Sequence, residues 1–131
     1  MTDIVNHPSH YEQNSIRLEP IHITSRLPHP IASAFEYCIR AGKKEGVPEE
    51  IDLKKALFWL NHFNEMLRQG FECNPLNSTD LMLLRKFGND LDFEFAYILF
   101  CVNPKDGRGW ELATRELINY VKRRLTTKEL I

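Results

Sequence analysis

The N-terminal stretch VNHPSHYEQ (residues 5–13) concentrates side chains of the kind that bind ligands. Histidine and serine donate hydrogen bonds to phosphate, and tyrosine offers a ring face for stacking. Histidines three residues apart could also hold a metal together with His22, but zinc needs three or four ligands that this spacing does not supply, so we expect no metal. Local capping of the backbone is the alternative. The ligand-binding residues predicted here are His7, Ser9, His10 and Tyr11.

A second cluster is the basic sequence RAGKK (residues 40–44). Arg40 and Lys43 lie three residues apart, so on a continuous helix they would project together and clamp a phosphate. Gly42 would let a ligand approach the backbone closely. The alternative is a solvated helix end whose cations complement the helix dipole. This cluster adds Arg40, Lys43 and Lys44 to the predicted site.

A third set follows a 3-4-3 spacing: Asp52, Lys55, Trp59 and His62. This spacing aligns them along one stripe of a helix, apart from the leucine face of the same helix. The stripe combines an acid, a cation and a ring on which a base could stack. It could equally be a solvated surface with one packed tryptophan. Asp52 is the candidate catalytic residue, since with Glu49 or Glu50 it could hold Mg²⁺ if the protein were a kinase.

Helical periodicity dominates the rest of the chain. A short helix is favoured over a strand in residues 16–27, because Pro20 suits a first helical turn. Residues 91–102 have both helical and alternating spacing, and we predict a helix because the neighbouring elements are helical. The longer helices are expected in residues 30–43, 47–70, 79–87, 91–102 and 110–125. We therefore predict an all-α single domain (1–131) of about four main helices with an irregular N-terminal segment.

The same periodicity predicts which residues face the core. Ser78 or Thr79 is expected to cap the helix that follows. All three cysteines are expected to be buried thiols. The predicted inward-facing residues are Ile31, Ala34, Phe35, Cys38, Leu53, Leu57, Leu60, Leu67, Leu112, Ala113, Leu117, Tyr120 and Val121.

Composition limits the partners. The net charge of −1 attracts neither nucleic acid nor an anionic membrane, so any anion site has to be local. No apolar run is long enough to span a bilayer. Eight phenylalanines and two tryptophans are more large apolar groups than one small core easily buries. We therefore expect a homo-oligomer.

Four motifs, NHPSHY, EPI, EYCIRAGKK and DLKKALFWL, resemble in order and spacing the SaV-like family of small bacteriophage proteins. The resemblance covers about residues 4–67, and residues 71–131 are expected to be a helical extension. That family is a domain of unknown function, and some members are described as phage nucleotide kinases. Glu36 departs from the lysine often found before the family tyrosine and weakens an anion site there. The matching positions are Asn6, His7, Pro8, His10, Tyr11, Tyr37, Arg40, Gly42, Lys43, Asp52, Leu53, Lys55 and Ala56.

The resemblance implies a phage origin, a setting in the host cytoplasm and work on nucleotides. The first hypothesis is a binding protein for a phosphorylated nucleotide that sequesters a host nucleotide signal. The second is a nucleoside monophosphate kinase with Mg²⁺, although the chain contains no G-x-x-x-x-G-K-[ST] loop. The third is an inhibitor that binds a host protein directly. A nucleotide in the predicted site would count against the third hypothesis, and turnover of that nucleotide would distinguish the second from the first.

Overall fold

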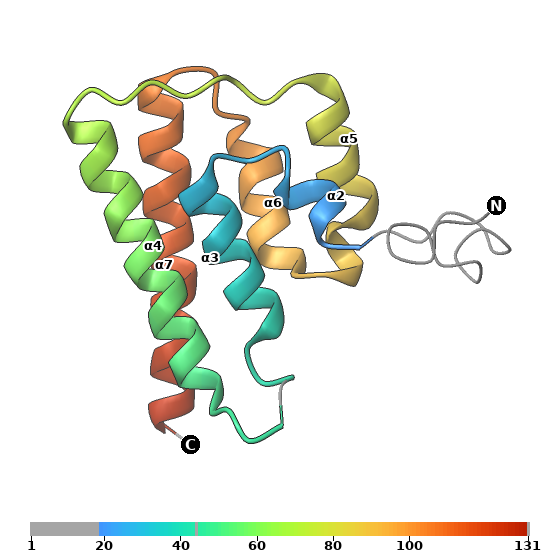
Figure 1. Ribbon diagram of the computed structural model, residues 1–131, viewed down its shortest axis with the longest axis vertical. Coiled ribbons are helices and arrows are strands. Elements are labelled where there is room, and N and C mark those ends of the chain that lie inside the picture. Colours follow the sequence, from blue (N-terminus) through green and yellow to red (C-terminus); the bar gives the residue numbers. More distant parts are fainter. Residues whose placement is uncertain (1–18, 44, 131) are drawn as a thin grey trace, which may run out of the picture.

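The computed structural model describes residues 19–43 and 45–130, which form helices and no strand (Figure 1). This confirms the predicted all-α class. The N-terminal cluster of His7, Ser9, His10 and Tyr11, and also Lys44, lie outside the described residues. The elements are α2 (Ile21–Thr24), α3 (His29–Arg40), α4 (Glu49–Arg68), α5 (Ser78–Phe87), the 3₁₀ turn η1 (Gly88–Asp90), α6 (Phe93–Val102) and α7 (Gly107–Leu130).

The helices pack as neighbours that run in alternating directions (Figure 1). α3 and α4 form an antiparallel hairpin, and the long helix α7 lies against α4. α6 packs on α7, and α5 packs on α6. The short α2 contacts both α3 and α5, so it joins the two ends of this arrangement.

The core lies where the apolar faces of these helices meet. All four residues predicted to face inward from α3 are buried: Ile31, Ala34, Phe35 and Cys38. Phe35 contacts Phe95 of α6 with ring centroids 4.6 Å apart, and Phe63 of α4 meets Trp110 of α7 at 5.9 Å. Each large apolar side chain buried in this way contributes about 1.5–3 kcal/mol. These rings hold the α3–α4 hairpin against the C-terminal helices.

Local backbone preferences explain where α3 and α5 end or begin. α3 stops at Arg40, because Ala41 leaves the helical conformation (ψ 122°) and Gly42 adopts a φ of +82°. A residue with a side chain would be strained at that φ. α5 is capped by Asn77 and not by Ser78 or Thr79 as predicted: the Asn77 side chain accepts the backbone N–H of Asp80, whose carboxylate accepts the N–H of Asn77. This reciprocal pair is a capping box.

Two predictions about burial were also wrong. Leu112 is 39% exposed, because the inward face of α7 runs through Trp110, Ala113 and Leu117. The three cysteines differ in burial: Cys38 is buried, Cys73 is half-buried and Cys101 is exposed. Among the described residues, no helix is both long and apolar enough to cross a membrane.

Arg124 of α7 is the centre of a polar network that joins four helices. Its Nη1 atom lies 3.2 Å from the carbonyl oxygen of Cys38 in the last turn of α3, and 3.2 Å from the Oδ2 of Asp92 at the start of α6. Its Nη2 atom donates to Glu49 at the start of α4 (2.9 Å). The Tyr120 hydroxyl lies 2.7 Å from both oxygens of Asp92, which also caps α6 through the N–H of Phe95. The network therefore fixes one end of α3, α4 and α6 relative to α7.

Burial shifts the titration of two groups in this network. Desolvation and the nearby Asp92 carboxylate raise the pKa of the Tyr120 hydroxyl well above its usual range. Desolvation, followed by the charge of Asp92, likewise raises the pKa of the Cys38 thiol. Both groups therefore stay neutral in the folded protein at pH values where the unfolded chain would ionise them.

We predict that Arg124→Ala lowers the free energy of unfolding by about 2–4 kcal/mol, because it leaves two partly buried carboxylates without their cation. Arg123→Ala is the matched control, since Arg123 pairs with Glu94 on the exposed neighbouring surface. We expect the control to cost less than about 1 kcal/mol. Urea unfolding measures both. Equal losses in the two variants would contradict a central role for Arg124.

We also predict that stability falls as the solution becomes alkaline. The unfolded chain ionises cysteine from about pH 8.5 and tyrosine from about pH 10, whereas the folded protein keeps Cys38 and Tyr120 protonated. The contribution of these two groups to the free energy of unfolding is therefore fully present below these pH values and decreases as the pH rises above them. Tyr120→Phe should flatten the decline above about pH 10. Thermal unfolding measured at several pH values tests this, and an unchanged slope in Tyr120→Phe would contradict it.

Candidate functional site

The antiparallel hairpin brings one stripe of α3 beside the predicted stripe of α4. We call this surface the α3–α4 face; its members on α3 are His29, Ser33, Tyr37 and Arg40, and those on α4 are Asp52, Lys55, Trp59 and His62. Each set repeats every three or four residues, so it occupies one side of its helix. Residues at the end of α3 consequently meet residues at the start of α4. The stripe predicted on α4 thus forms half of a larger surface.

Tyr37, Arg40, Asp52 and Lys55 make up the first part of the face, which we call the Tyr37 cluster. The guanidinium carbon of Arg40 lies 5.0 Å from the centroid of the Tyr37 ring, and the Nζ of Lys55 lies 5.6 Å from it. An aromatic ring attracts cations at such distances. Arg40 also pairs with Asp52, with Nη2 3.3 Å from Oδ1. Two cations and one carboxylate leave the cluster with a net charge of +1.

Asp52 differs in exposure from the cation that it contacts. Its side chain is 1% exposed, whereas that of Arg40 is 50% exposed. Within the part of the chain that the structure describes, the Oδ2 atom of Asp52 is buried and has no hydrogen-bond partner. A carboxylate in this position is costly to desolvate. Asp52 therefore contacts the Arg40 guanidinium through one nitrogen, and half of the Arg40 side chain stays exposed to solvent.

The second part of the face, one helical turn along α4, is aromatic. The Trp59 ring meets His29 edge-on at 5.3 Å and His62 at 6.0 Å. Phe58 meets Trp59 edge-on at 5.5 Å and lies parallel to His62 at 6.2 Å. We call His29, Phe58, Trp59 and His62 the aromatic rim. Phe58 is exposed, so the rim offers an apolar ring surface to solvent.

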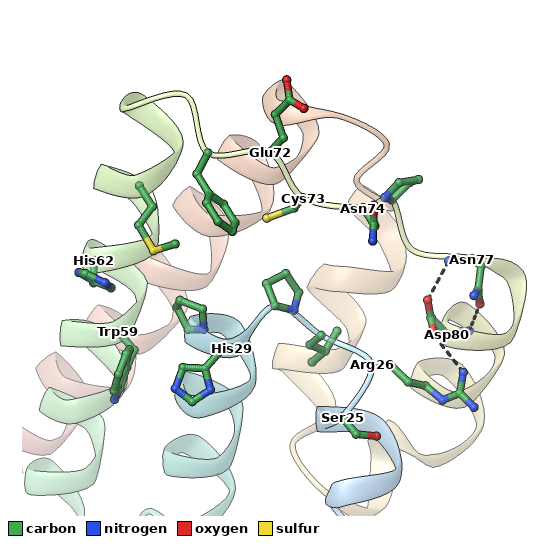
Figure 2. A pocket seen from close by; sticks show the side chains of 16 residues that line it. Ser25, Arg26, His29, Trp59, His62, Glu72, Cys73, Asn74, Asn77 and Asp80 are labelled. Carbon is green, nitrogen blue, oxygen red and sulfur yellow. Dashed lines mark hydrogen bonds and ion pairs between the residues drawn. The ribbon is translucent and has the colours of Figure 1, made fainter.

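A cleft of about 690 Å³ opens beside the aromatic rim. It lies between the α2–α3 turn, the C-terminal half of α4 and the connector that leads to α5 (Figure 2). His29, Trp59 and His62 line one side of it, and Arg26, Asn77 and Asp80 line the other (Figure 2). The volume lies within the range of small-molecule sites.

The structure brings together most of the predicted residues that it describes. Tyr37, Arg40, Asp52 and Lys55 meet in the Tyr37 cluster, and Trp59 lies one turn away. Lys43 does not follow the prediction, because α3 ends at Arg40 and the two residues no longer share a helical stripe. Lys43 instead lies exposed in the turn, where its N–H donates to the carbonyl of Arg40.

Sequence reasoning missed His29, Phe58 and Arg26. His29 could have been found, because it continues the spacing of Tyr37 and Arg40 backwards along α3. Phe58 lies beside the predicted stripe and was not separated from the apolar face. Arg26 meets Asp80 at 3.3 Å, a partner 54 residues away that no local pattern indicates.

The described residues contain no group of three or more His, Cys, Asp or Glu side chains that could hold a metal ion. His22, considered above as a third ligand, accepts a hydrogen bond from the backbone N–H of Glu19 at its Nδ1 atom (3.0 Å). Its environment is therefore that of a local turn contact.

Comparison with known proteins adds one match. A family model described as a protein of unknown function (DUF3310) matches residues 5–61. No curated protein and no solved structure matches the chain. The matched segment contains the Tyr37 cluster and most of the aromatic rim, and it ends before His62 and before α5, α6 and α7. Its description names no activity, so the phage origin and the SaV-like grouping stay expectations.

We predict that Asp52→Asn leaves the stability unchanged or raises it by up to about 1 kcal/mol, because the amide avoids the cost of a buried charge. Asp80→Asn is the matched control. Both oxygens of Asp80 are bonded, one to Arg26 and one to the N–H of Asn77, so we expect a loss of about 1–2 kcal/mol. Thermal unfolding compares the two. A loss in Asp52→Asn as large as the control's would indicate that Asp52 serves the fold alone.

Proposed function

We propose that the protein binds a phosphorylated nucleotide along the α3–α4 face, with the phosphate at the Tyr37 cluster and the base toward the aromatic rim. The observation that carries the proposal is the pair of cations over one tyrosine ring, one of them oriented by a buried carboxylate. Burying the Asp52 carboxylate to orient Arg40 costs desolvation energy. This cost favours a function that uses the oriented guanidinium.

The phosphate end is supported by charge and geometry. Two cations close to one ring repel each other, and Asp52 offsets only one of their charges. An anion between them relieves that repulsion. Arg40 has five N–H groups, and the contact with Asp52 uses a single nitrogen. The remaining fork matches the paired oxygens of a phosphate.

The base end is supported by spacing. Lys55 and Trp59 are four residues apart, which is about 6 Å along a helix axis. A ribose with its phosphate chain can bridge such a separation. The rings of Trp59, Phe58 and His62 then offer a base a face or an edge to stack on. Base stacking on an aromatic side chain contributes about 1–3 kcal/mol.

Simple binding fits this geometry better than catalysis. Asp52, the candidate catalytic residue, is buried and contacts Arg40, which suits a residue that positions a cation. The kinase alternative needs Asp52 to act on Mg²⁺ and a transferred phosphoryl group. A binder needs no further groups. The use that we infer, from the family resemblance, is sequestration of a host nucleotide signal in the host cytoplasm during phage infection.

We predict that calorimetry with mono-, di- and cyclic nucleotides detects binding that Lys55→Ala weakens about tenfold, the effect of one charge-assisted hydrogen bond. Lys54→Ala is the control, because Lys54 is the exposed neighbour of Lys55 and lies off the face. Arg40→Lys should also weaken binding, since an ammonium keeps the charge beside Asp52 but lacks the fork.

Three outcomes would contradict the proposal. They are no binding to any nucleotide, equal effects of the Lys54 and Lys55 substitutions, and tight binding that does not depend on phosphate. Formation of a nucleoside diphosphate from a monophosphate and ATP would instead favour the kinase alternative. In that case Asp52→Asn should abolish turnover while binding persists.

We also propose that the protein is a homo-oligomer, through the outer face of α5 and α6. Phe93 is 55% exposed and its ring stacks on the exposed Tyr97, 5.5 Å away. Met82 of α5 is exposed as well. α6 (FEFAYILFCV) contains a single charged residue, which is unusual for a helix with one side in water. A second copy of the chain would cover these rings.

We predict that Phe93→Ser combined with Tyr97→Ser lowers the mass measured by light scattering at micromolar concentration. Ile51→Ser is the control, because Ile51 is an exposed apolar residue on α4, away from this surface. A monomeric mass for the unaltered protein would contradict the proposal. An equal effect of the control would place the interface elsewhere.

A further inference from the structure

The cleft beside the aromatic rim contains an arginine whose position is fixed by a buried acid. Nη1 of Arg26 lies 3.3 Å from Oδ1 of Asp80, and the two side chains are 41% and 9% exposed. The second carboxylate oxygen of Asp80 accepts the N–H of Asn77 at 2.9 Å. Asp80 is therefore anchored by the capping box of α5, and it holds one nitrogen of Arg26. Arg26 lines the cleft and its side chain is partly exposed, and its contact with Asp80 uses one nitrogen only, so the guanidinium keeps further N–H donors.

The two sides of the cleft differ in chemistry. Figure 2 shows Arg26 extending toward α5 and Asp80, with His29, Trp59 and His62 on the opposite side. One side thus supplies rings and the other the guanidinium of Arg26. A planar ring that lies between them can contact the aromatic side and present one edge to the arginine.

The charge of the cleft decides which acceptors suit Arg26. Its lining contains Arg26, Asp80 and Glu72, a net charge of −1 with the histidines neutral. The Tyr37 cluster, in contrast, has a net charge of +1. An anionic group is therefore disfavoured in the cleft and favoured at the cluster. The Arg26 fork suits a neutral edge with two adjacent acceptors.

We infer that the cleft binds a guanine-type purine, with the O6 and N7 edge facing the Arg26 fork. This inference rests on the proposed function, because it assigns the base of the nucleotide whose phosphates lie at the Tyr37 cluster. Guanine presents two adjacent acceptors on this edge, whereas adenine presents one acceptor and one donor. The donor of adenine would face the donors of Arg26, so the cleft discriminates between the two purines.

The test varies the ligand and leaves the protein unaltered, so it does not depend on how substitutions affect folding. Guanosine, adenosine and 7-deazaguanosine, which lacks the N7 acceptor, are compared by calorimetry, each also as its 5′-diphosphate. Guanosine and its diphosphate are expected to bind at least about tenfold more tightly than the adenine compounds. 7-Deazaguanosine should lose most of this preference. Tryptophan fluorescence reports the location, because Trp59 lines the cleft whereas Trp110 is buried.

The outcomes separate this inference from the proposed function. The diphosphate should bind more tightly than guanosine, because only its phosphates reach the Tyr37 cluster. Nucleotides that bind without a guanine preference, or with 7-deazaguanosine as tight as guanosine, would overturn the inference and leave phosphate binding intact. Guanosine binding that the phosphates do not strengthen would overturn the proposed function alone. No binding of any guanine compound would overturn both.

Discussion

The contact on which the rest of the structure depends is that of Arg124 with the ends of three other helices. Its guanidinium meets a carbonyl in the last turn of α3, a carboxylate in the first turn of α4 and the capping carboxylate of α6. Carbonyls at a helix end and carboxylates at a helix start are both groups that a cation can satisfy. Because Glu49 also lies against Gly42, the contact fixes the turn between α3 and α4. The register that places Arg40 beside Asp52 follows from that turn.

The two ends of the α3–α4 hairpin have opposite charge, which the net charge of the whole chain does not indicate. The chain has a net charge of −1, yet the Tyr37 cluster is positive and the cleft at the other end of the hairpin is negative. In both places an exposed arginine is held by a buried aspartate at 3.3 Å. The two pairs differ in how well the acid is satisfied. Asp80 is bonded through both oxygens and supports a helix end, whereas Asp52 has one buried oxygen without a partner among the described residues.

The fold was more predictable from the sequence than the site. The core positions of α3 follow from 3.6-residue periodicity, and burial at Ile31 and Phe35 confirms them. The helix over residues 93–102 was also predictable, although its alternating aromatics imitate a strand. The prediction that Lys43 and Arg40 project together was wrong, because the backbone leaves the helical conformation at Ala41. The spacing of the two residues does not indicate this change. Arg26 and Asp80 are 54 residues apart, so only the packing of α2 on α5 brings them together. Long-range contacts of this kind leave no local trace in a sequence.

The separation in sequence between the α3–α4 hairpin and Arg124 has a consequence for synthesis on the ribosome. The segment that matches the family model ends at residue 61, but Arg124, whose guanidinium contacts the start of α4, is translated 63 residues later. At usual rates of translation this interval is about 3–12 s. During that time the apolar faces of α3 and α4 have emerged without the α7 helix that covers them. The α3–α4 face, although encoded early, is therefore held in place only after α7 has been translated.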